Sequence, residues 1–267
     1  MEESAPAGGQ LLVEKEGPIG WLIFNRPERH NAVTYEMWEA IPQVLAGMAA
    51  DDDVRIVVLK GAGGRSFVSG ADISQFAEKR SSEDAVRIYN AATDLANRTL
   101  TTFAKPTIAM IDGYCIGGGC AIAIACDLRI ASPKSTFGIP AAKLGLGYAY
   151  ANVRKLVDLV GPSFAKEIFF TARQFSAAEA LGMGLINRVA EEGGLQAQVE
   201  ETAHTIGANA PLTIRAVKAS VAEALRDPDD RDVERVERMV ADCFTSEDYQ
   251  EGRKAFMEKR PPEFRGR

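Results

Sequence analysis

Apolar and polar residues follow two different periods along the first half of the chain. Six short apolar runs, typical of buried strands, lie at residues 11–13, 19–24, 54–60, 107–111, 128–131 and 136–139. Two longer stretches with helical spacing lie between them, at residues 34–50 and 81–102. Thr34 is a good N-cap for the first helix, and Pro42 is expected to kink it. The recurring order of strand, strand and helix predicts an α/β fold.

After residue 141 the pattern becomes mainly helical, with one further strand expected at residues 185–189. Seven helices are expected, at residues 151–160, 162–170, 177–181, 195–208, 212–225, 230–244 and 246–259. The segments Asn209-Ala210-Pro211 and Asp227-Pro228-Asp229 mark breaks between the last of them. The second half of the chain is therefore expected to be a predominantly helical region.

A glycine-rich segment in the middle of the chain is the most informative local feature. The apolar strand at residues 107–111 leads through a turn into Gly117, Gly118 and Gly119, and an almost wholly apolar helix, Cys120 to Cys126, follows. A helix that is apolar all round is buried, so its amino end points its unpaired N–H groups into the protein. Because glycine lets a ligand reach the main chain, this segment can form a backbone oxyanion hole.

Composition narrows the class of protein. At 267 residues the chain can bury a substantial core, and its net charge of −6 without a basic block argues against nucleic-acid binding. No apolar run approaches the ~20 residues of a membrane span, and residues 1–10 lack the parts of a secretion signal. The four cysteines show no C-x-x-C spacing and no cluster has metal-ligand spacing. We expect a soluble cytoplasmic protein with reduced thiols and no metal.

Five ordered motifs resemble the enoyl-CoA hydratase/isomerase (crotonase) superfamily over nearly the whole chain. They are residues 105–131, Asn25-Arg26-Pro27 through Asn31-Ala32, residues 67–73, Phe137-Gly138-Ile139-Pro140 and residues 251–260. The resemblance implies a flexible N-terminus at residues 1–10, a ββα-spiral core at 11–190 and a C-terminal helical region at 191–267. It also implies a homotrimer, or a dimer of trimers, that acts on an acyl-CoA. Coenzyme A would then be part of the substrate, with no tightly bound cofactor.

The same resemblance assigns candidate site residues. Ala71 and Gly118 match the positions whose backbone N–H groups bind the thioester oxygen, although each glycine of these motifs could serve only as a turn. Asp72 could instead cap the helix that begins at Ile73, and Arg29 could be a solvated turn residue. The expected contacts to coenzyme A, besides Ala71 and Gly118, are Arg29, His30, Ala32, Asp72, Ile73, Phe256 and Lys259.

Two departures from the family pattern bear on the reaction. Ala121 and Ala141 stand where a hydratase of this family has glutamates, and alanine can neither accept a proton nor orient water. Tyr148, in a Leu-Gly-x-x-Tyr sequence, is similar to the methylmalonyl-CoA decarboxylase branch, but it could also be a packing aromatic. We therefore favour decarboxylation through a thioester enolate. The alternatives are an unusual hydratase that positions water with Tyr148 or Asn152, and a non-catalytic acyl-CoA-binding subunit.

Overall fold

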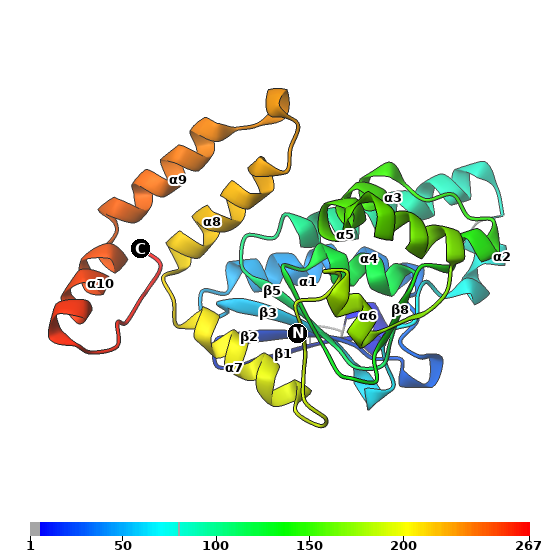
Figure 1. The fold of residues 1–267 in the computed structure, drawn as a ribbon, viewed down its shortest axis with the longest axis horizontal. Helices are drawn as coiled ribbons and strands as arrows, with labels where there is room; N and C mark the ends of the chain where they lie inside the picture. The colour runs from blue at the N-terminus through cyan, green and yellow to red at the C-terminus, as the bar shows by residue number, and fades with distance from the viewer. Residues whose placement is uncertain (1–5, 80) are drawn as a thin grey trace.

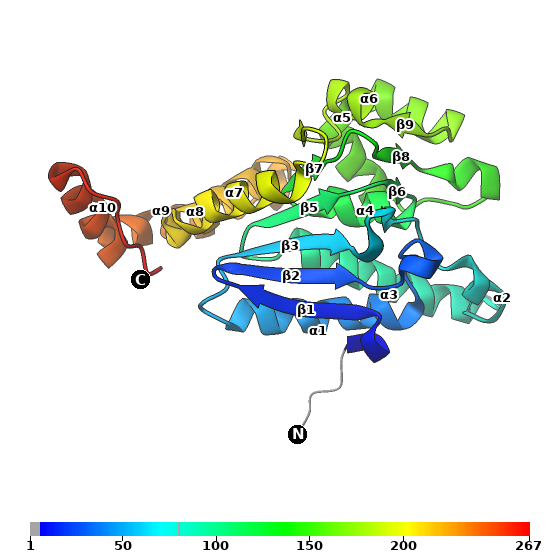
Figure 2. The same ribbon diagram turned by 90° about the horizontal axis from the view of Figure 1, so that it is seen from below.

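A six-stranded sheet forms the centre of the computed structural model, which describes residues 6–79 and 81–267. Its strand order is β1 (Leu11–Glu16), β2 (Ile19–Phe24), β3 (Ile56–Gly61), β5 (Thr107–Ile111), β7 (Leu128–Ala131) and β10 (Arg188–Val189). The β1–β2 hairpin is antiparallel, whereas the remaining neighbours are parallel. Figure 2 shows this sheet nearly face-on at β1, β2 and β3.

A second, four-stranded sheet is made of very short strands. Its order is β4 (Ser66–Val68), β6 (Tyr114–Ile116), β8 (Thr136–Gly138) and β9 (Phe175–Ser176), with only β9 antiparallel to its neighbour. Along the chain β3 is followed by β4, β5 by β6 and β7 by β8, and a helix closes each pair. The predicted α/β fold with a repeated strand–strand–helix unit is therefore confirmed.

Helices cover both faces of the large sheet. On one face lie α1 (Tyr35–Ala50), α3 (Glu83–Thr101) and α4 (Gly118–Ala125), and α7 (Leu195–Gly207) covers the other. Strand β2 serves both layers because successive side chains alternate, so Trp21 packs towards α7 while Leu22 and Phe24 pack towards α1. The remaining helices of the body are α2 (Phe76–Lys79), α5 (Tyr150–Thr171) and α6 (Ala177–Gly182).

Several predicted boundaries differ from the observed ones. The helices expected at residues 151–160 and 162–170 join into α5, which bends at Gly161, where φ is 74°. The strand expected at residues 185–189 is reduced to β10. The N–H groups of Leu185 and Ile186 donate to the Ala180 carbonyl in a turn, and the Leu185 carbonyl accepts from the Arg129 side chain. Thr34 is the N-cap of α1, as expected, but the expected kink is absent, because α1 runs through Pro42 as one helix. Residues 1–5 of the expected flexible N-terminus lie outside the described residues, whereas Pro6–Gly9 form a short 3-10 helix.

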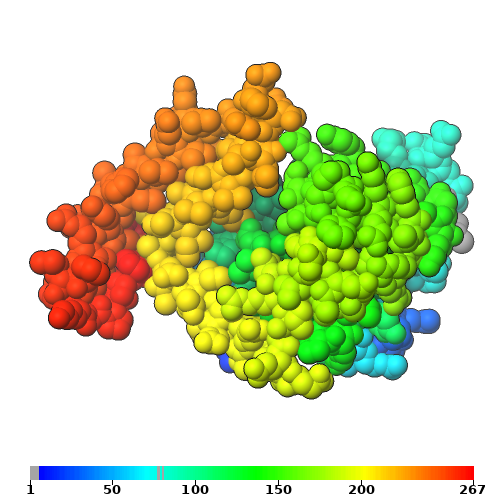
Figure 3. Space-filling model, in the orientation of Figure 1, coloured from blue at the N-terminus to red at the C-terminus, as the bar shows by residue number. Residues whose placement is uncertain are grey.

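The last three helices form an arm that extends away from the body, which we call the C-terminal arm (residues 211–267). It comprises α8 (Pro211–Ala224), α9 (Val233–Thr245) and α10 (Glu247–Glu258), and it occupies one end of the molecule in Figures 1 and 3. Lys218 of α8 joins it to the body, since its Nζ lies 2.6 Å from an Asp127 carboxylate oxygen and donates to the Lys105 carbonyl. Among the described helices, none is long and apolar enough to cross a membrane.

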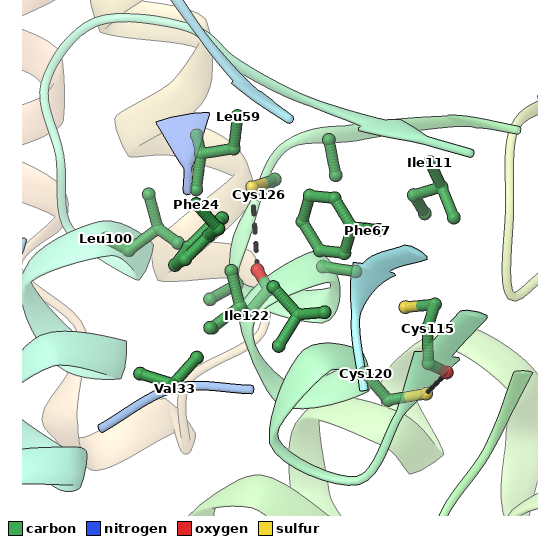
Figure 4. Close-up of a cluster of buried hydrophobic side chains, with 14 of the residues drawn as sticks. Phe24, Val33, Leu59, Phe67, Leu100, Ile111, Cys115, Cys120, Ile122 and Cys126 are labelled. Atoms are coloured by element: carbon green, nitrogen blue, oxygen red, sulfur yellow. Dashed lines mark hydrogen bonds between the residues drawn. The ribbon is translucent and has the colours of Figure 1, made fainter. Parts of the chain in front are cut away.

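Free thiols lie in the core around α4. Cys115, Cys120 and Cys126 are buried, and Figure 4 shows them among Phe24, Phe67 and other apolar side chains. The Cys120 and Cys126 thiols donate to the carbonyls of Cys115 and Ile122. Burial raises the pKa of Cys126 to about 12, so this thiol stays protonated. All four cysteines are free thiols in the structure, and three of them belong to the core.

Candidate active site

The loop after β4 and the amino end of α4 bring two backbone N–H groups together. Ala71 follows the positive-φ residue Gly70, and Gly118 follows the positive-φ residue Gly117 and begins α4. A β-carbon placed on Gly118 would lie 3.4 Å from the backbone nitrogen of Ala71, and one on Gly70 would lie 4.0 Å from the nitrogen of Gly118. Both approaches depend on the absence of side chains at these glycines.

Both of these N–H groups are free in the part of the chain that the structure describes. The strand-like bridge of Val33 with Ala71 uses the carbonyl of Gly70 and the N–H of Asp72, each at 2.9 Å, so the N–H of Ala71 is left over. Gly118 is the first residue of α4 and therefore has no intrahelical acceptor for its N–H. We call these two groups the donor pair. Two adjacent, unpaired N–H groups can bind one oxygen atom that carries developing negative charge.

An ion pair fixes the loop that carries Ala71. The Arg26 guanidinium lies 2.9 Å from Asp72, both side chains are largely buried, and the same guanidinium donates to the carbonyl of Ala32 at 2.6 Å. Asp72 also accepts from the backbone and hydroxyl of Ser74, which confirms its role as a helix cap. Burial alone would raise the pKa of Asp72, but the hydrogen bonds from Ser74 and Arg26 outweigh it and lower that pKa. Asp72 is thus ionised and fully engaged in the fold.

Ala121 and Ala141, which stand where the resemblance implies glutamates in a hydratase, both lie near the start of α4. Ala121 lies in its first turn, and Ala141 is buried in the 3-10 helix Pro140–Leu144. Pro140, the residue before Ala141, approaches α4 closely, since its Cδ lies 4.0 Å from the β-carbon position of Gly117. Neither position offers a carboxylate to a substrate whose thioester oxygen is bound by the donor pair.

Tyr148 lies beside the same helix as a neutral phenol. Its ring packs edge-to-face on Phe169 with the centroids 4.8 Å apart. Burial raises the pKa of Tyr148 well above its usual value, and the neighbouring Cys120 thiol of α4 adds to this shift. No hydrogen bond of its hydroxyl occurs among the described residues. The phenol can therefore donate a proton or a hydrogen bond at neutral pH, but it cannot act as a base.

The predicted contacts to coenzyme A fall into two groups. Arg29 is exposed in the 3-10 helix Pro27–Arg29, Ile73 is 64% exposed, and the His30 ring is fixed by Ser66 through a 3.0 Å hydrogen bond. Phe256 and Lys259 lie at the end of α10, at the opposite end of the molecule from α2 (Figures 1 and 2). Within one chain, the structure does not bring Phe256 and Lys259 to the donor pair.

A large apolar groove lies in the C-terminal arm, remote from the donor pair. It encloses about 1010 Å³ between α8, α9 and α10, and its lining includes Val217, Phe244, Phe256 and Met257, all more than half exposed. Monomeric proteins rarely expose so many apolar side chains together. This groove is therefore a candidate interaction surface, separate from the candidate active site.

Sequence reasoning missed one residue at the site. Trp38 of α1 is only 2% exposed, and its Cζ2 atom lies 3.3 Å from the β-carbon position of Gly118. Its indole nitrogen is buried, and no described residue accepts a hydrogen bond from it. In the sequence Trp38 stands one turn after Thr34 on the apolar side of its helix, which is typical of an ordinary core residue. No sequence signal distinguishes it from a core tryptophan.

Comparison with known proteins agrees with this geometry. Residues 14–267 match the family described as enoyl-CoA hydratase/isomerase. The chain belongs to this family. It is 35% identical over 250 residues to a short-chain-enoyl-CoA hydratase from Clostridium acetobutylicum, covering 94% of this chain and 95% of that protein. It is 34% identical over 258 residues to a crotonyl-CoA hydratase from Syntrophomonas wolfei, covering 95% and 97%.

Solved structures of the family share the fold. The crystal structure of an enoyl-CoA hydratase/isomerase family protein from Hyphomonas neptunium superposes with a TM-score of 0.92 at 35% identity, covering 97% of this chain and 98% of that chain. The crystal structure of an enoyl-CoA hydratase from Bacillus anthracis superposes with a TM-score of 0.88 at 27% identity, covering 97% of this chain and 100% of that chain. The predicted superfamily and spiral fold are confirmed. Among residues 6–79 and 81–267, no group of three or more His, Cys, Asp or Glu side chains is arranged to bind a metal ion.

Proposed function

We propose that this protein is an acyl-CoA lyase that removes a carboxylate from the α-carbon of an acyl-CoA through a thioester enolate. The observation that carries the proposal is the combination of a free donor pair at Ala71 and Gly118 with alanine at both positions 121 and 141. An enzyme with this arrangement can stabilise an enolate oxygen but has no carboxylate there to remove a proton. Decarboxylation needs the first capability and not the second.

The reaction balances without a base. The bond between the α-carbon and the carboxylate breaks, its electron pair forms the enolate, and the carboxylate leaves as CO₂. The negative charge develops on the thioester oxygen, between the N–H groups of Ala71 and Gly118. Each such donor contributes roughly 2.7–4 kcal/mol to transition-state stabilisation in enzymes where one has been removed. The α-carbon then takes a proton, and we assign its delivery to the neutral Tyr148 phenol, which would regain a proton from solvent.

Hydration of a short-chain enoyl-CoA is the second candidate. The names of the relatives, short-chain-enoyl-CoA hydratase and crotonyl-CoA hydratase, favour it. Hydration requires a group that positions and deprotonates water, and loss of a positioned acid or base typically costs ~10²–10⁴ in rate. In a hydratase we would assign this part to Tyr148 or Asn152, and Tyr148 stays protonated. The residues therefore favour decarboxylation over hydration.

Mass spectrometry of a panel of CoA esters separates these functions. With malonyl-CoA and methylmalonyl-CoA, decarboxylation lowers the mass of the ester by about 44, whereas hydration of crotonyl-CoA raises it by about 18. We expect the mass loss with malonyl-CoA or methylmalonyl-CoA, whose carboxylate is on the α-carbon, and at most a trace of the mass gain with crotonyl-CoA. Hydration of crotonyl-CoA at about 10 s⁻¹ or more, a rate typical of metabolic enzymes, would refute it. Binding of the esters without any change of mass would indicate a non-catalytic subunit.

We also infer that the active form is a homotrimer or a dimer of trimers in the reducing cytoplasm. The exposed apolar groove of the C-terminal arm supports association, and the four free thiols support the compartment. In such an assembly Phe256 and Lys259 of one subunit would reach the coenzyme A bound by a neighbour. This arrangement would account for their distance from the donor pair in a single chain.

A further inference from the structure

We propose that the indole N–H of Trp38 is a third hydrogen-bond donor of the active site. It would select acyl groups that carry an oxygen on the carbon β to the thioester carbonyl, which is the position of a β-carboxylate or of a 3-oxo group. This inference rests on the proposed acyl-CoA function and names the substrate feature that the site recognises.

The position of Trp38 places its ring at the edge of the oxygen-binding space. Its Cζ2 lies 3.3 Å from the point where a β-carbon of Gly118 would stand, and that point lies 3.4 Å from the nitrogen of Ala71. The space left open by the missing side chain of Gly118 is therefore bordered both by the indole ring and by the nitrogen of Ala71. The indole nitrogen is two bonds from Cζ2, on the same edge of the ring.

The hydrogen-bonding state of Trp38 is unusual for a buried tryptophan. The residue is 2% exposed, and among the described residues its Nε1 has no acceptor. Buried indole N–H groups usually have a partner, and an unpaired buried donor costs the protein stability. An unpaired donor beside a candidate catalytic group is an informative exception. A substrate oxygen at this point would satisfy the indole.

The chemistry of the indole fits an acceptor on the acyl chain. An indole N–H is a neutral donor with no acceptor capacity, so it binds a carboxylate or ketone oxygen and offers nothing to a hydroxyl proton. A neutral donor also orients a β-carboxylate without the ion pair that would oppose the departure of neutral CO₂. A plain alkyl chain would leave the indole unpaired, and sites built around a hydrogen bond discriminate strongly against ligands that lack it.

Calorimetry with two matched ligands tests the inference. Acetoacetyl-CoA and butyryl-CoA have the same chain length and differ in the oxygen at this acyl carbon. The wild-type protein should bind acetoacetyl-CoA more tightly, and Trp38→Phe should reduce the ratio of the two affinities by about tenfold, the typical effect of one hydrogen bond. Trp21→Phe is the control, because Trp21 is equally buried but packs against the opposite face of the sheet. An unchanged ratio in folded Trp38→Phe would overturn the inference.

A second measurement does not depend on the folding of the Trp38 variant. The chain has two tryptophans, so isotope-labelled protein gives two indole N–H resonances, and Trp21→Phe assigns them. Acetoacetyl-CoA should move the Trp38 resonance downfield and butyryl-CoA should not. An equal response to both ligands would contradict the proposal. Neither ligand has a carboxylate to lose, so this selectivity can hold even if the protein decarboxylates nothing, and decarboxylation can occur without it.

Discussion

Replacing Gly118 by alanine tests the donor pair with the smallest possible change. The new methyl group would lie 3.4 Å from the nitrogen of Ala71, in the space that the thioester oxygen is proposed to occupy, while the N–H of residue 118 is kept. Gly118 has an ordinary negative φ, so alanine fits its backbone without strain. The variant therefore blocks the Ala71 donor and leaves the helix start intact.

The structure predicts a large effect on turnover and a small one on stability. Blocking one donor of an oxyanion hole typically lowers kcat by ~10²–10³. The methyl would meet Cζ2 of Trp38 at 3.3 Å, a tight contact that requires a small shift of the ring. Alanine in place of glycine in a helix raises the free energy of unfolding by up to about 1 kcal/mol, which offsets the cost of this tight contact. The melting temperature should therefore stay within about 4 °C of the wild-type value.

The assay compares turnover of the preferred CoA ester with the thermal melt of the same preparation. Gly47→Ala in α1 is the matched control, since no atom lies within 4 Å of its new methyl group and the position is far from the donor pair in the chain. The control should keep full activity and gain slightly in stability. A folded Gly118→Ala protein with wild-type turnover would show that the thioester oxygen is not bound between Ala71 and Gly118.

Three further predictions concern the alanines, the supporting ion pair and the arm. Ala121→Glu with Ala141→Glu should create measurable hydration of crotonyl-CoA. Burial at position 141 should raise the pKa of the new carboxyl there. Hydration of crotonyl-CoA by the wild-type protein at a comparable rate would contradict this prediction. Asp72→Asn keeps the cap but removes the carboxylate partner of Arg26 and leaves that guanidinium only its bond to the Ala32 carbonyl, so urea unfolding at pH 7 should show a loss of about 1–3 kcal/mol. The pKa of Asp72 is lowered from 3.8 in the folded protein, so its stabilisation is fully present above pH 3.8 and is lost as the pH falls through the folded pKa. If the wild-type and Asp72→Asn proteins differ in free energy of unfolding by the same amount at pH 7 and at pH 2, the ion pair does not stabilise the fold. Light scattering at micromolar concentration should give a trimer or hexamer mass, and a monomer would exclude association through the C-terminal arm.

The sequence predicted the parts of the fold that have strong local patterns. Strands β2, β5 and β7 and the cap at Thr34 lie where the apolar runs and the capping residue placed them. Strands β4 and β6 were missed because each has three residues and lies next to turn signals such as Gly113. Runs this short carry no period, and they form strands only because neighbouring turns of the spiral pair with them.

The candidate site could be predicted only in part. Ala71 and Gly118 were predicted from their motifs. Each motif contains glycine where two backbone segments approach each other, and such glycines form a recognisable sequence pattern. The ion pair of Arg26 with Asp72 joins residues far apart in the sequence, so no local pattern predicts it. That no described residue accepts from the Trp38 indole follows from the three-dimensional packing and cannot be read from the sequence. The separation of Phe256 from the donor pair is a property of how the C-terminal arm extends, which no local pattern encodes.

Vibrational difference spectroscopy of a bound ester shows whether the donor pair binds and polarises the thioester oxygen. Butyryl-CoA labelled at its thioester carbonyl gives a stretch that moves to lower frequency when two N–H groups donate to the oxygen. We expect this shift on binding to the wild-type protein and a smaller shift with Gly118→Ala. A bound ester whose carbonyl stretch stays at its value in water would show that the N–H groups of Ala71 and Gly118 do not bind the thioester oxygen.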